Sequence, residues 1–406
     1  MKKIFLAAFT LLGMHLAKAQ NERAITTGVP FLLIAADARS AGMADQGVAT
    51  APDAFSQQFN PAKYAFALNE YGASVSYTPY LTGIANDISL GQLTFYKRLS
   101  DERSAFAGSL RYFGLGDIEL RTNPEDPARV VSPAELAVDL SYSLKLSERF
   151  AMAIGGRFIS SNLRIPETSE GGDASAATSF AFDVAGFYQS EEIAYDDFNG
   201  RWRAGFNFQN IGPKINYNND DVADDTNANF LPANLRLGAG FDFIFDEYNK
   251  VGVNLEVTKL LVPTPPAFVT PVDTDGDGEI GDDEEDAAAA QYSSDLQDYK
   301  NTSWVSGIFS SFGDAPDGFK EEIKEFTYAV GAEYLYQDSF ALRLGYFNED
   351  PSKGARKFFS LGAGFKYTTI KVDVSYLFSA SQVRNPLENT LRFSLTFNFG
   401  EEFDEY

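Results

Sequence analysis

Large apolar and polar residues alternate along most of this chain. In the stretch 391–399 (LRFSLTFNF), every odd position is large and apolar and every even position is polar. A period of two places one kind of side chain on each face of a β-strand. Similar stretches recur about fourteen times between Glu70 and Phe399, each of roughly the 9–11 residues that cross a bilayer at a tilt. The pattern predicts an all-β fold, namely a transmembrane antiparallel outer-membrane β-barrel of about 14 strands.

The connections between these stretches predict the orientation of the barrel. We expect strands near residues 70–80, 88–98, 104–113, 135–146, 149–162, 177–189, 201–210, 233–245, 250–261, 325–336, 339–348, 356–367, 369–379 and 389–399. Short and long connections then alternate, and the longest covers 262–324. Bacterial barrels have short periplasmic turns and long outer loops. We therefore expect both termini to be periplasmic and 262–324 to be a long extracellular loop within one barrel domain, 67–406.

The first residues predict export from the cytoplasm. Lys2 and Lys3 precede a short apolar run, 4–12, and a small-residue cleavage site, 17–19 (AKA). These are the parts of a signal peptide, so residues 1–19 are expected to be removed. The alternative, a transmembrane anchor, needs about 20 apolar residues, and this run is shorter. Together with the barrel pattern, the signal predicts an integral protein of the cell outer membrane.

Composition removes most catalytic chemistry. The chain has no Cys, and its only His, His15, lies in the expected signal peptide. The mature chain therefore lacks the residues of Ser-His-Asp and Cys-His catalytic systems and of ordinary structural zinc sites, and we do not expect an enzyme. Removal of residues 1–19 leaves 30 basic residues against 57 acidic ones, a formal charge of −27. This charge argues against nucleic acid as a partner.

The face opposite the apolar series predicts a charged lumen. Acidic and basic residues occur there in nearly equal numbers: Asp139, Asp183, Asp242, Glu256, Glu333 and Asp373 against Arg111, Arg157, Arg203, Arg236, Arg343, Lys366 and Arg392. A ring of one sign is typical of an ion-selective pore, whereas balanced charges favour pairing between neighbouring strands. Glycines at other inward positions, such as Gly238 and Gly362, leave room for a segment to pack close to the wall.

Residues 20–66 lack the strand pattern. They combine an apolar run, 29–34 (VPFLLI), with small residues and the segment 58–62 (QFNPA). The motif Asn60, Pro61, Ala62, after 39–44 (RSAGMA), resembles the N-terminal hatch of the FadL superfamily of outer-membrane hydrophobe transporters. The resemblance implies that 20–66 is a hatch that plugs the barrel. The alternative is a flexible periplasmic tail, which the many apolar and few charged residues disfavour.

Within that superfamily, the chain resembles the PorV family of type IX secretion nearly end to end. The resemblance rests on 208–214 (FQNIGPK), 230–238 (FLPANLRLG) and 354–399, which includes 373–377 (DVSYL) and 385–387 (NPL). It implies a fourteen-stranded barrel without enzymatic activity. The resemblance also implies that the protein acts as a shuttle for secreted proteins. It would accept this cargo through the cargo's C-terminal signal domain at the type IX translocon, and pass it to the cell-surface sortase, or attachment, complex.

One motif in the longest loop predicts a cofactor. Residues 273–284 (DTDGDGEIGDDE) match the spacing of a calcium loop. The expected ligands are Asp273, Asp275, Asp277, the backbone carbonyl of Glu279, and a bidentate Glu284, while Gly278 permits the sharp turn. Residues 282–294 can form the exiting helix, but four prolines within 263–271 forbid an entering one. We expect a lone Ca²⁺ loop of roughly millimolar affinity; the alternative is a solvated acidic loop.

An apolar stripe follows later in the same loop. Trp304, Ile308, Phe309 and Phe312 fall at near-helical spacing. The stripe is expected either to fold back on the barrel mouth or to bind a protein partner. The outward face of the barrel itself is expected to contact outer-membrane lipid and lipopolysaccharide.

Three functions therefore compete at the level of sequence. The first is the secretion shuttle, which the ordered motifs and the large outer loop favour. The second is a FadL-type transporter of fatty acids or other hydrophobic small molecules, which the hatch and barrel alone would support. The third, an outer-membrane lipid hydrolase, is disfavoured because the mature chain has no histidine.

Overall fold

A computed structural model describes residues 24–82, 85, 87–121, 125, 127–163, 176–217, 228–276, 278–381 and 387–403. The expected signal peptide, 1–19, lies outside the described residues, and so does Asp277. No helix in these ranges is long and apolar enough to cross a membrane.

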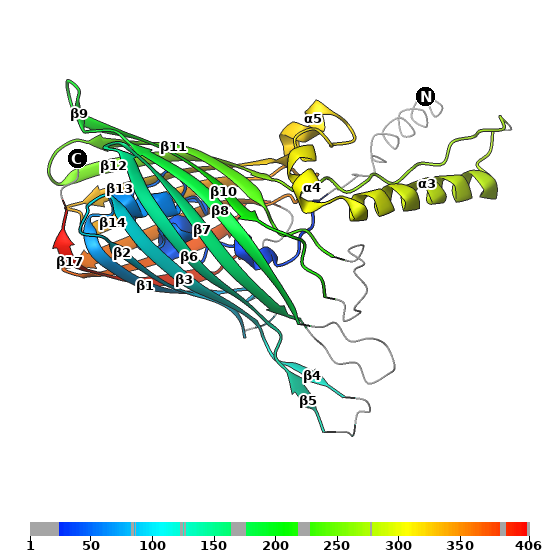
Figure 1. Ribbon diagram of the computed structural model, residues 1–406, viewed down its shortest axis with the longest axis horizontal. Coiled ribbons are helices and arrows are strands. Elements are labelled where there is room, and N and C mark those ends of the chain that lie inside the picture. The colour runs from blue at the N-terminus through cyan, green and yellow to red at the C-terminus, as the bar shows by residue number, and fades with distance from the viewer. Residues whose placement is uncertain are drawn as a thin grey trace, which may run out of the picture.

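Fourteen antiparallel strands within the described ranges form one closed barrel (Figure 1). Each strand pairs with the next along the chain, β17 pairs with β1, and β10 pairs with β11, so that no barrel strand is left with a free edge. The prediction of the fold class is confirmed. The strands are β1 (Asn69–Pro79), β2 (Ile88–Arg98), β3 (Ser104–Leu115), β6 (Ala134–Ser147), β7 (Phe150–Asn162), β8 (Ala177–Gln189), β10 (Asn199–Ile211), β11 (Asn234–Ile244), β12 (Asn249–Leu260), β13 (Phe326–Tyr336), β14 (Phe340–Asn348), β15 (Lys357–Tyr367), β16 (Ile370–Ser379) and β17 (Leu391–Glu402).

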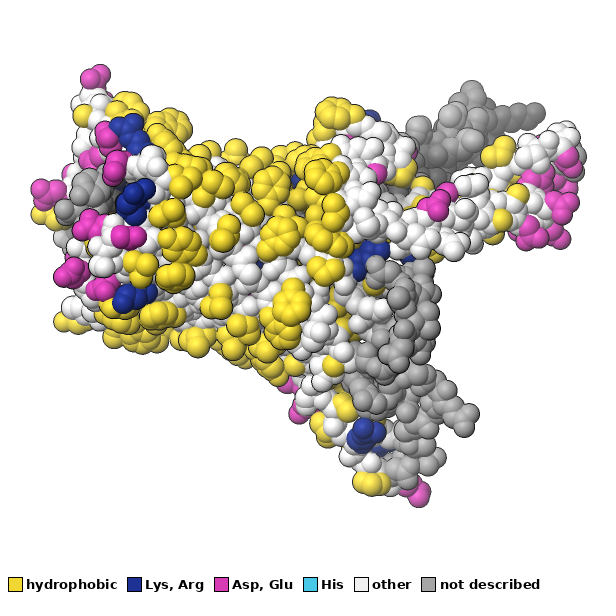
Figure 2. Space-filling model, viewed as in Figure 1, with side chains coloured by type: hydrophobic (Ala, Val, Ile, Leu, Met, Phe, Trp, Pro, Cys, Tyr) yellow, Lys and Arg dark blue, Asp and Glu magenta, His cyan; other side chains and the backbone are white. Residues whose placement is uncertain are grey.

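Burial alternates along each barrel strand as the sequence pattern predicts. On β17, the side chains of Leu391 and Phe393 are 44% and 46% exposed, whereas Arg392 and Ser394 are 1% and 3% exposed. The exposed apolar residues of all strands form a belt around the barrel, and charged residues gather at its edge (Figure 2). Because a lipid-facing surface must be apolar and the lumen is enclosed, this arrangement is that of a membrane barrel.

Short and long connections lie at opposite ends of the barrel, which we call the short-turn end and the long-loop end. The short-turn end carries connections such as 148–149 and 368–369, and the end of β17. The long-loop end carries two short strands, β4 (Ile118–Leu120) and β5 (Arg129–Val131), and the helices α3 (Asp282–Asn301), α4 (Trp304–Ser310) and α5 (Phe319–Glu322), followed by the 3₁₀ turn η5 (Ile323–Glu325). One turn at the short-turn end is longer and contains β9 (Ile193–Ala194).

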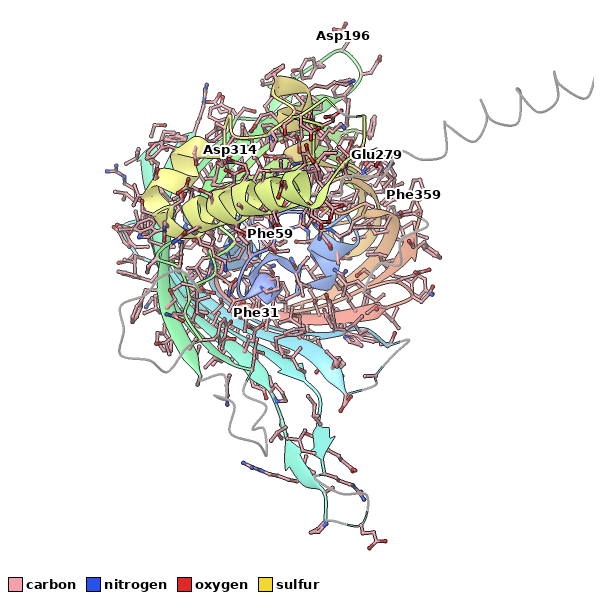
Figure 3. All side chains as sticks on the ribbon, turned by 90° about the vertical axis from the view of Figure 1, so that its right-hand side faces the viewer. Phe31, Phe59, Asp196, Glu279, Asp314 and Phe359 are labelled. Carbon is pink, nitrogen blue, oxygen red and sulfur yellow. The ribbon has the colours of Figure 1, made fainter. Side chains whose placement is uncertain are left out.

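The segment before β1 fills the lumen. It contains η1 (Pro30–Leu33), α2 (Ala38–Ala41), η2 (Ser56–Gln58) and η3 (Pro61–Phe66), and nearly all its side chains from Val29 to Ala67 are buried. Figure 3 looks into the long-loop end and shows Phe31 and Phe59 inside the ring of strands, whereas Phe359 lies on the outside. We call residues 29–67 the plug.

The path of the plug corrects one expectation. The amide of Gly28 donates to the carbonyl of Phe230 at 2.8 Å, and Phe31 stacks on Phe113, so the plug starts among the long loops. It then runs through the lumen to β1 at the short-turn end. The first described residues and the end of β17 therefore lie at opposite ends of the barrel. This arrangement differs from the expectation that both termini lie on the same, periplasmic side, because the plug spans the lumen; the termini themselves lie outside the described residues.

Candidate functional site

The lumen-facing charges pair between neighbouring strands. Arg157 on β7 contacts Asp139 on β6 and Asp183 on β8, the latter at 3.1 Å. Arg343 on β14 contacts Glu333 on β13 at 2.7 Å and Asp373 on β16 at 2.8 Å. Two further pairs, Arg203–Asp242 and Arg236–Glu256, join β10 to β11 and β11 to β12. For these residues the predicted pairing is confirmed, although Arg343 and Asp373 lie on strands separated by β15. Arg111 and Arg392 of the predicted set contact the plug instead. The pairs stabilise the wall, because an isolated charge in such an enclosed space would be costly.

The plug is bound to the wall by charged groups of its own. Arg39 of α2 donates to both carboxylate oxygens of Glu333, at 3.1 and 2.8 Å, and to Asp53 of the plug at 2.5 Å. Asp45 of the plug pairs with Arg392 of β17 at 2.8 Å. Arg39, Glu333 and Arg392 are all more than nine-tenths buried. A two-oxygen contact with a guanidinium fixes geometry as well as charge, so these pairs set the position of the plug.

Backbone groups of the plug are also satisfied by wall side chains. One carboxylate oxygen of Glu256 accepts hydrogen bonds from the amides of Gly47 and Val48, at 2.8 and 2.9 Å. Its other oxygen pairs with Arg236. The amide of Ala44 donates to the hydroxyl of Ser360 at 2.9 Å. Irregular backbone at membrane depth is tolerated only when such partners exist, and the lumen supplies them.

The predicted hatch motif lies at the centre of this packing. Asn60 caps η3 by accepting from the amide of Ala62 at 3.1 Å, and Pro61 occupies the first helical position. The Asn60 amide also donates to the carbonyls of Val48 and of Gly186 on β8, both at 2.9 Å. Asn60 is fully buried. The motif therefore joins two turns of the plug to the wall.

Glycines of the wall allow the plug backbone to approach. A Cβ atom on Gly205 would lie 2.2 Å from the carbonyl oxygen of Val48, and one on Gly345 would lie 2.3 Å from the amide nitrogen of Ala44. Gly238 and Gly362, which the sequence singled out, likewise face Val48 and Gly42. Neighbouring backbone cannot move aside as a flexible side chain can, so Gly205 and Gly345 require glycine.

The predicted calcium loop forms a compact turn outside the barrel. Both oxygens of Asp273 accept backbone hydrogen bonds, from Gly276 at 2.6 Å and from Gly278 at 2.9 Å. Oxygens of Asp273, Asp275 and Glu284 lie within 4.8 Å of one another. The backbone amides of Gly281 and Thr274 hold the pKa of Glu284 below its usual range. The residues fit a hard cation, because carboxylate oxygens converge on one point.

The helix after this loop is also as predicted. α3 begins at Asp282, as expected for the exiting helix, and residues 262–272 before the loop contain no helix. The far end of α3 lies against the barrel mouth, where Tyr299 packs on Phe230 with ring centroids 5.7 Å apart. In Figure 1 the rest of α3 projects away from the barrel, and in the end-on view of Figure 3 it passes in front of the mouth.

The predicted apolar stripe is only partly folded back. Gly307 of α4 packs on Pro263 and Phe230, and Trp304 and Ile308 are half-buried. Phe309 and Phe312 are 75% and 49% exposed. Two exposed aromatics nearby in the chain, Phe268 and Phe319, were missed by the sequence reasoning. They lie outside the helical spacing that identified the stripe, and only a search for isolated aromatics in acidic loops would have found them.

The fold and its plugged lumen define an all-β, closed antiparallel outer-membrane barrel. By sequence, the chain belongs to the PorV family: the family described as "Type IX secretion system protein PorV" matches residues 17–267. No curated protein matches the chain by sequence.

Three solved structures are similar to this chain. They are the CymD monoaromatic hydrocarbon channel (14% identity, 92% of this chain and 99% of that chain covered, TM-score 0.49), the Pseudomonas putida toluene transporter TodX (11%, 91% and 99%, 0.47) and a Pseudomonas aeruginosa FadL homologue (12%, 90% and 98%, 0.42).

Proposed function

We propose that this protein receives secreted cargo, through the C-terminal signal domain of the cargo, at the type IX translocon and delivers it to the sortase complex that attaches it to the cell surface. Membership of the PorV family supports a role in type IX secretion. In this proposal the long-loop end faces the cell exterior and the barrel has no catalytic role.

The observation that carries the proposal is the plugged lumen. Asp37, Asn60 and Lys63 of the plug are at most 1% exposed, and the plug is held by Arg39–Glu333 and Arg392–Asp45 pairs. A conduit for fatty acids would have to break several of these buried contacts in each transport cycle. A carrier that binds proteins on its outer surface needs no such movement, and a rigid barrel suits it.

The apolar stripe offers a docking surface for cargo or translocon. Phe309 and Phe319 are 75% and 80% exposed at the long-loop end. Aromatic side chains of this kind dominate the binding energy of many protein interfaces. We therefore assign partner binding to Trp304, Ile308, Phe309 and Phe312, with Phe319 as an addition from the structure.

We further propose that Ca²⁺ binds the loop of Asp273, Asp275, Asp277, Glu279 and Glu284. The convergence of carboxylate oxygens from Asp273, Asp275 and Glu284 supports the site. Calcium there would order the turn that precedes α3, which projects from the long-loop end of the barrel. The site would thus set the shape of the surface offered to partners.

Deletion of the gene tests the proposed function. The deletion strain should release type IX cargo instead of attaching it to the cell surface, and its uptake of long-chain fatty acids should equal that of the parent. Cargo is measured by surface labelling and by immunoblots of the medium, and uptake by radiolabelled fatty acid. Complementation with the intact gene is the control. Normal surface attachment together with impaired uptake would replace the shuttle by the FadL-type transporter.

A further inference from the structure

A second group of acidic side chains lies at the base of the long loop, apart from the calcium loop. It brings together Asp314 from the α4–α5 connection, Glu321 and Glu322 from α5, and Glu325 from η5. The three glutamates are 5–7% exposed, and Asp314 is half-buried. We call these four residues the base cluster. Figure 3 shows Asp314 beside α4, near the rim of the barrel.

Two lysines enter the base cluster. Lys259 at the end of β12 lies 2.7 Å from Glu322 and 2.7 Å from Glu325. Lys353, from the connection between β14 and β15, lies 2.8 Å from Glu321 and 2.9 Å from Glu325. Both lysines are at least nine-tenths buried. Four carboxylates thus face two ammonium groups, and the cluster keeps a formal charge of −2 when all groups are ionised.

Two carboxylate oxygens of the cluster have neither a hydrogen-bond partner nor an ion-pair partner among the described residues. Thr264 donates its hydroxyl to Glu325 at 2.7 Å and its amide to Oδ2 of Asp314 at 3.1 Å. Oε1 of Glu322 contacts Lys259. Oε2 of Glu322 and Oδ1 of Asp314 are buried atoms with no partner among the described residues. A buried, ionised oxygen without a partner is unfavourable.

Three carboxylates of the cluster converge. One carboxylate oxygen from each of Asp314, Glu322 and Glu325 lies within 4.8 Å of the others. Oxygen donors alone, without nitrogen or sulfur, select a hard cation. Ca²⁺ tolerates an irregular set of carboxylates and completes its shell with water, whereas Mg²⁺ demands near-ideal octahedral geometry. The half-exposed Asp314 gives the ion a path from the solvent.

We propose that the base cluster is a second calcium site, formed by Asp314, Glu322 and Glu325, which clamps the α4–α5 segment to the end of β12. A divalent cation cancels the excess charge of −2 and supplies a partner to the two unsatisfied oxygens. The site joins the segment that carries the exposed Phe309 and Phe319 to the barrel wall. It does not depend on the proposed function or on the loop at 273–284.

Calcium titration of the full mature chain in detergent tests this site. The double variant Asp273→Ala/Glu284→Ala silences the other loop and serves as the background. After chelation, calorimetry with Ca²⁺ alone should find one bound ion per chain in this background. Terbium should bind in place of calcium, and its luminescence should be sensitised by Tyr299. This tyrosine is near the site: burial and the charge of Asp314 raise the pKa of Tyr299 to about 12.

Single substitutions locate the ion. Glu322→Gln in this background keeps the shape of the side chain and should weaken calcium binding at least about tenfold, because ligand charge sets affinity. Glu119→Gln, at an exposed glutamate of β4, should change nothing. Heat-modifiable migration verifies that each variant forms a barrel. If Glu322→Gln does not fold, the half-exposed Asp314→Asn decides instead.

Two results would overturn the site. The background variant could bind no calcium, which would mean that protons neutralise the cluster. Alternatively, calcium binding in that background could be the same with and without Glu322→Gln or Asp314→Asn, which would place the ion elsewhere. Binding of Mg²⁺ at equal or higher affinity than Ca²⁺ would contradict the choice of ion.

Discussion

The plug and the long-loop helices are both additions to the same barrel, yet their surroundings differ. The plug lies inside the wall, and its charged groups, such as Arg39 and Asp45, have partners on the strands. The segment from α4 to α5 lies outside the wall and leaves Phe309 and Phe319 more than 70% exposed. Ion pairs with the wall therefore hold the plug in place, whereas the outer segment has aromatic side chains that no described residue covers.

This difference assigns different tasks to the two regions. A segment with satisfied buried ion pairs is expensive to move, because each broken pair leaves a charge without compensation. An exposed aromatic surface in an acidic loop gains free energy when a partner covers it. We therefore expect the plug to be rigid and the long-loop end to bind partners. Each of the following variants tests one side of this difference.

The largest effect is expected from Glu333→Ala. This carboxylate accepts from both Arg39 and Arg343, so its removal leaves two buried guanidinium groups undercompensated. The free energy of unfolding should fall by about 3–5 kcal/mol, measured by urea titration of heat-modifiable gel migration. Glu247→Ala, an exposed acid in a short turn, should change it by less than about 0.5 kcal/mol. If both variants changed the free energy of unfolding equally, the ion pairs between plug and wall would not stabilise the protein.

Loss of the apolar stripe should affect binding and leave the barrel intact. The triple variant Trp304→Ser/Ile308→Ser/Phe309→Ser is expected to weaken capture of cargo or translocon by at least about 2 kcal/mol, the scale of an aromatic hot spot. Copurification from the native outer membrane measures capture, and gel migration reports barrel assembly. Undiminished capture by an assembled variant would show that recognition lies elsewhere.

A pair of glycine variants compares the two faces of the wall. Gly345→Ala places a Cβ atom 2.3 Å from the amide of Ala44 in the plug, whereas a Cβ atom on the lipid-facing Gly156 meets nothing within 4 Å. Overpacking at Gly345 should cost about 1–3 kcal/mol and expose residues 29–67 to protease. Gly156→Ala should be neutral in both assays. Similar behaviour of the two variants would argue against tight contact between plug and wall.

The calcium loop should give the smallest effect. At ten times its dissociation constant, calcium stabilises the folded loop by about 1.4 kcal/mol. Limited proteolysis near residues 273–284 should therefore slow when calcium is added, and Asp273→Ala/Glu284→Ala should abolish this protection while the barrel assembles normally. The base cluster lies in the same long loop, so Glu322→Gln serves as the matched control. In this variant, calcium should still slow cleavage near residues 273–284. Protection near residues 273–284 that persists in the double variant would disprove the loop site.

The sequence was most informative where one physical constraint governs every residue. Lipid on one side and an enclosed lumen on the other impose a period of two, so the expected strands agree with those observed to within about three residues. The pairing of lumen charges followed from the same alternation. The partners of the plug did not, because Arg39 and Glu333 lie 294 residues apart and no local pattern connects them.

Two other features could not be predicted from the sequence for the same reason. The side on which the plug begins depends on its contact with Phe230, far along the chain. The base cluster combines acidic residues from the α4–α5 region, among them Asp314, with Lys259 at the end of β12 and Lys353 from the β14–β15 connection. Such features depend on the closure of the barrel, which brings distant segments together.

A reversible lock on the plug tests the central claim most directly. A Cβ atom on Gly238 of the wall would lie 3.2 Å from Cβ of Ala49 in the plug, close to the roughly 3.5–4.5 Å of a disulfide, and 2.4 Å from Cγ1 of Val48. Val48→Ala removes that close contact, and the chain has no native cysteine. A strain that carries Val48→Ala/Ala49→Cys/Gly238→Cys should attach type IX cargo to its surface at the level of a Val48→Ala strain, with the disulfide either formed or reduced. Loss of attachment only in the oxidised form, with recovery on reduction, would contradict the account, since it would mean that the plug must move for the protein to work.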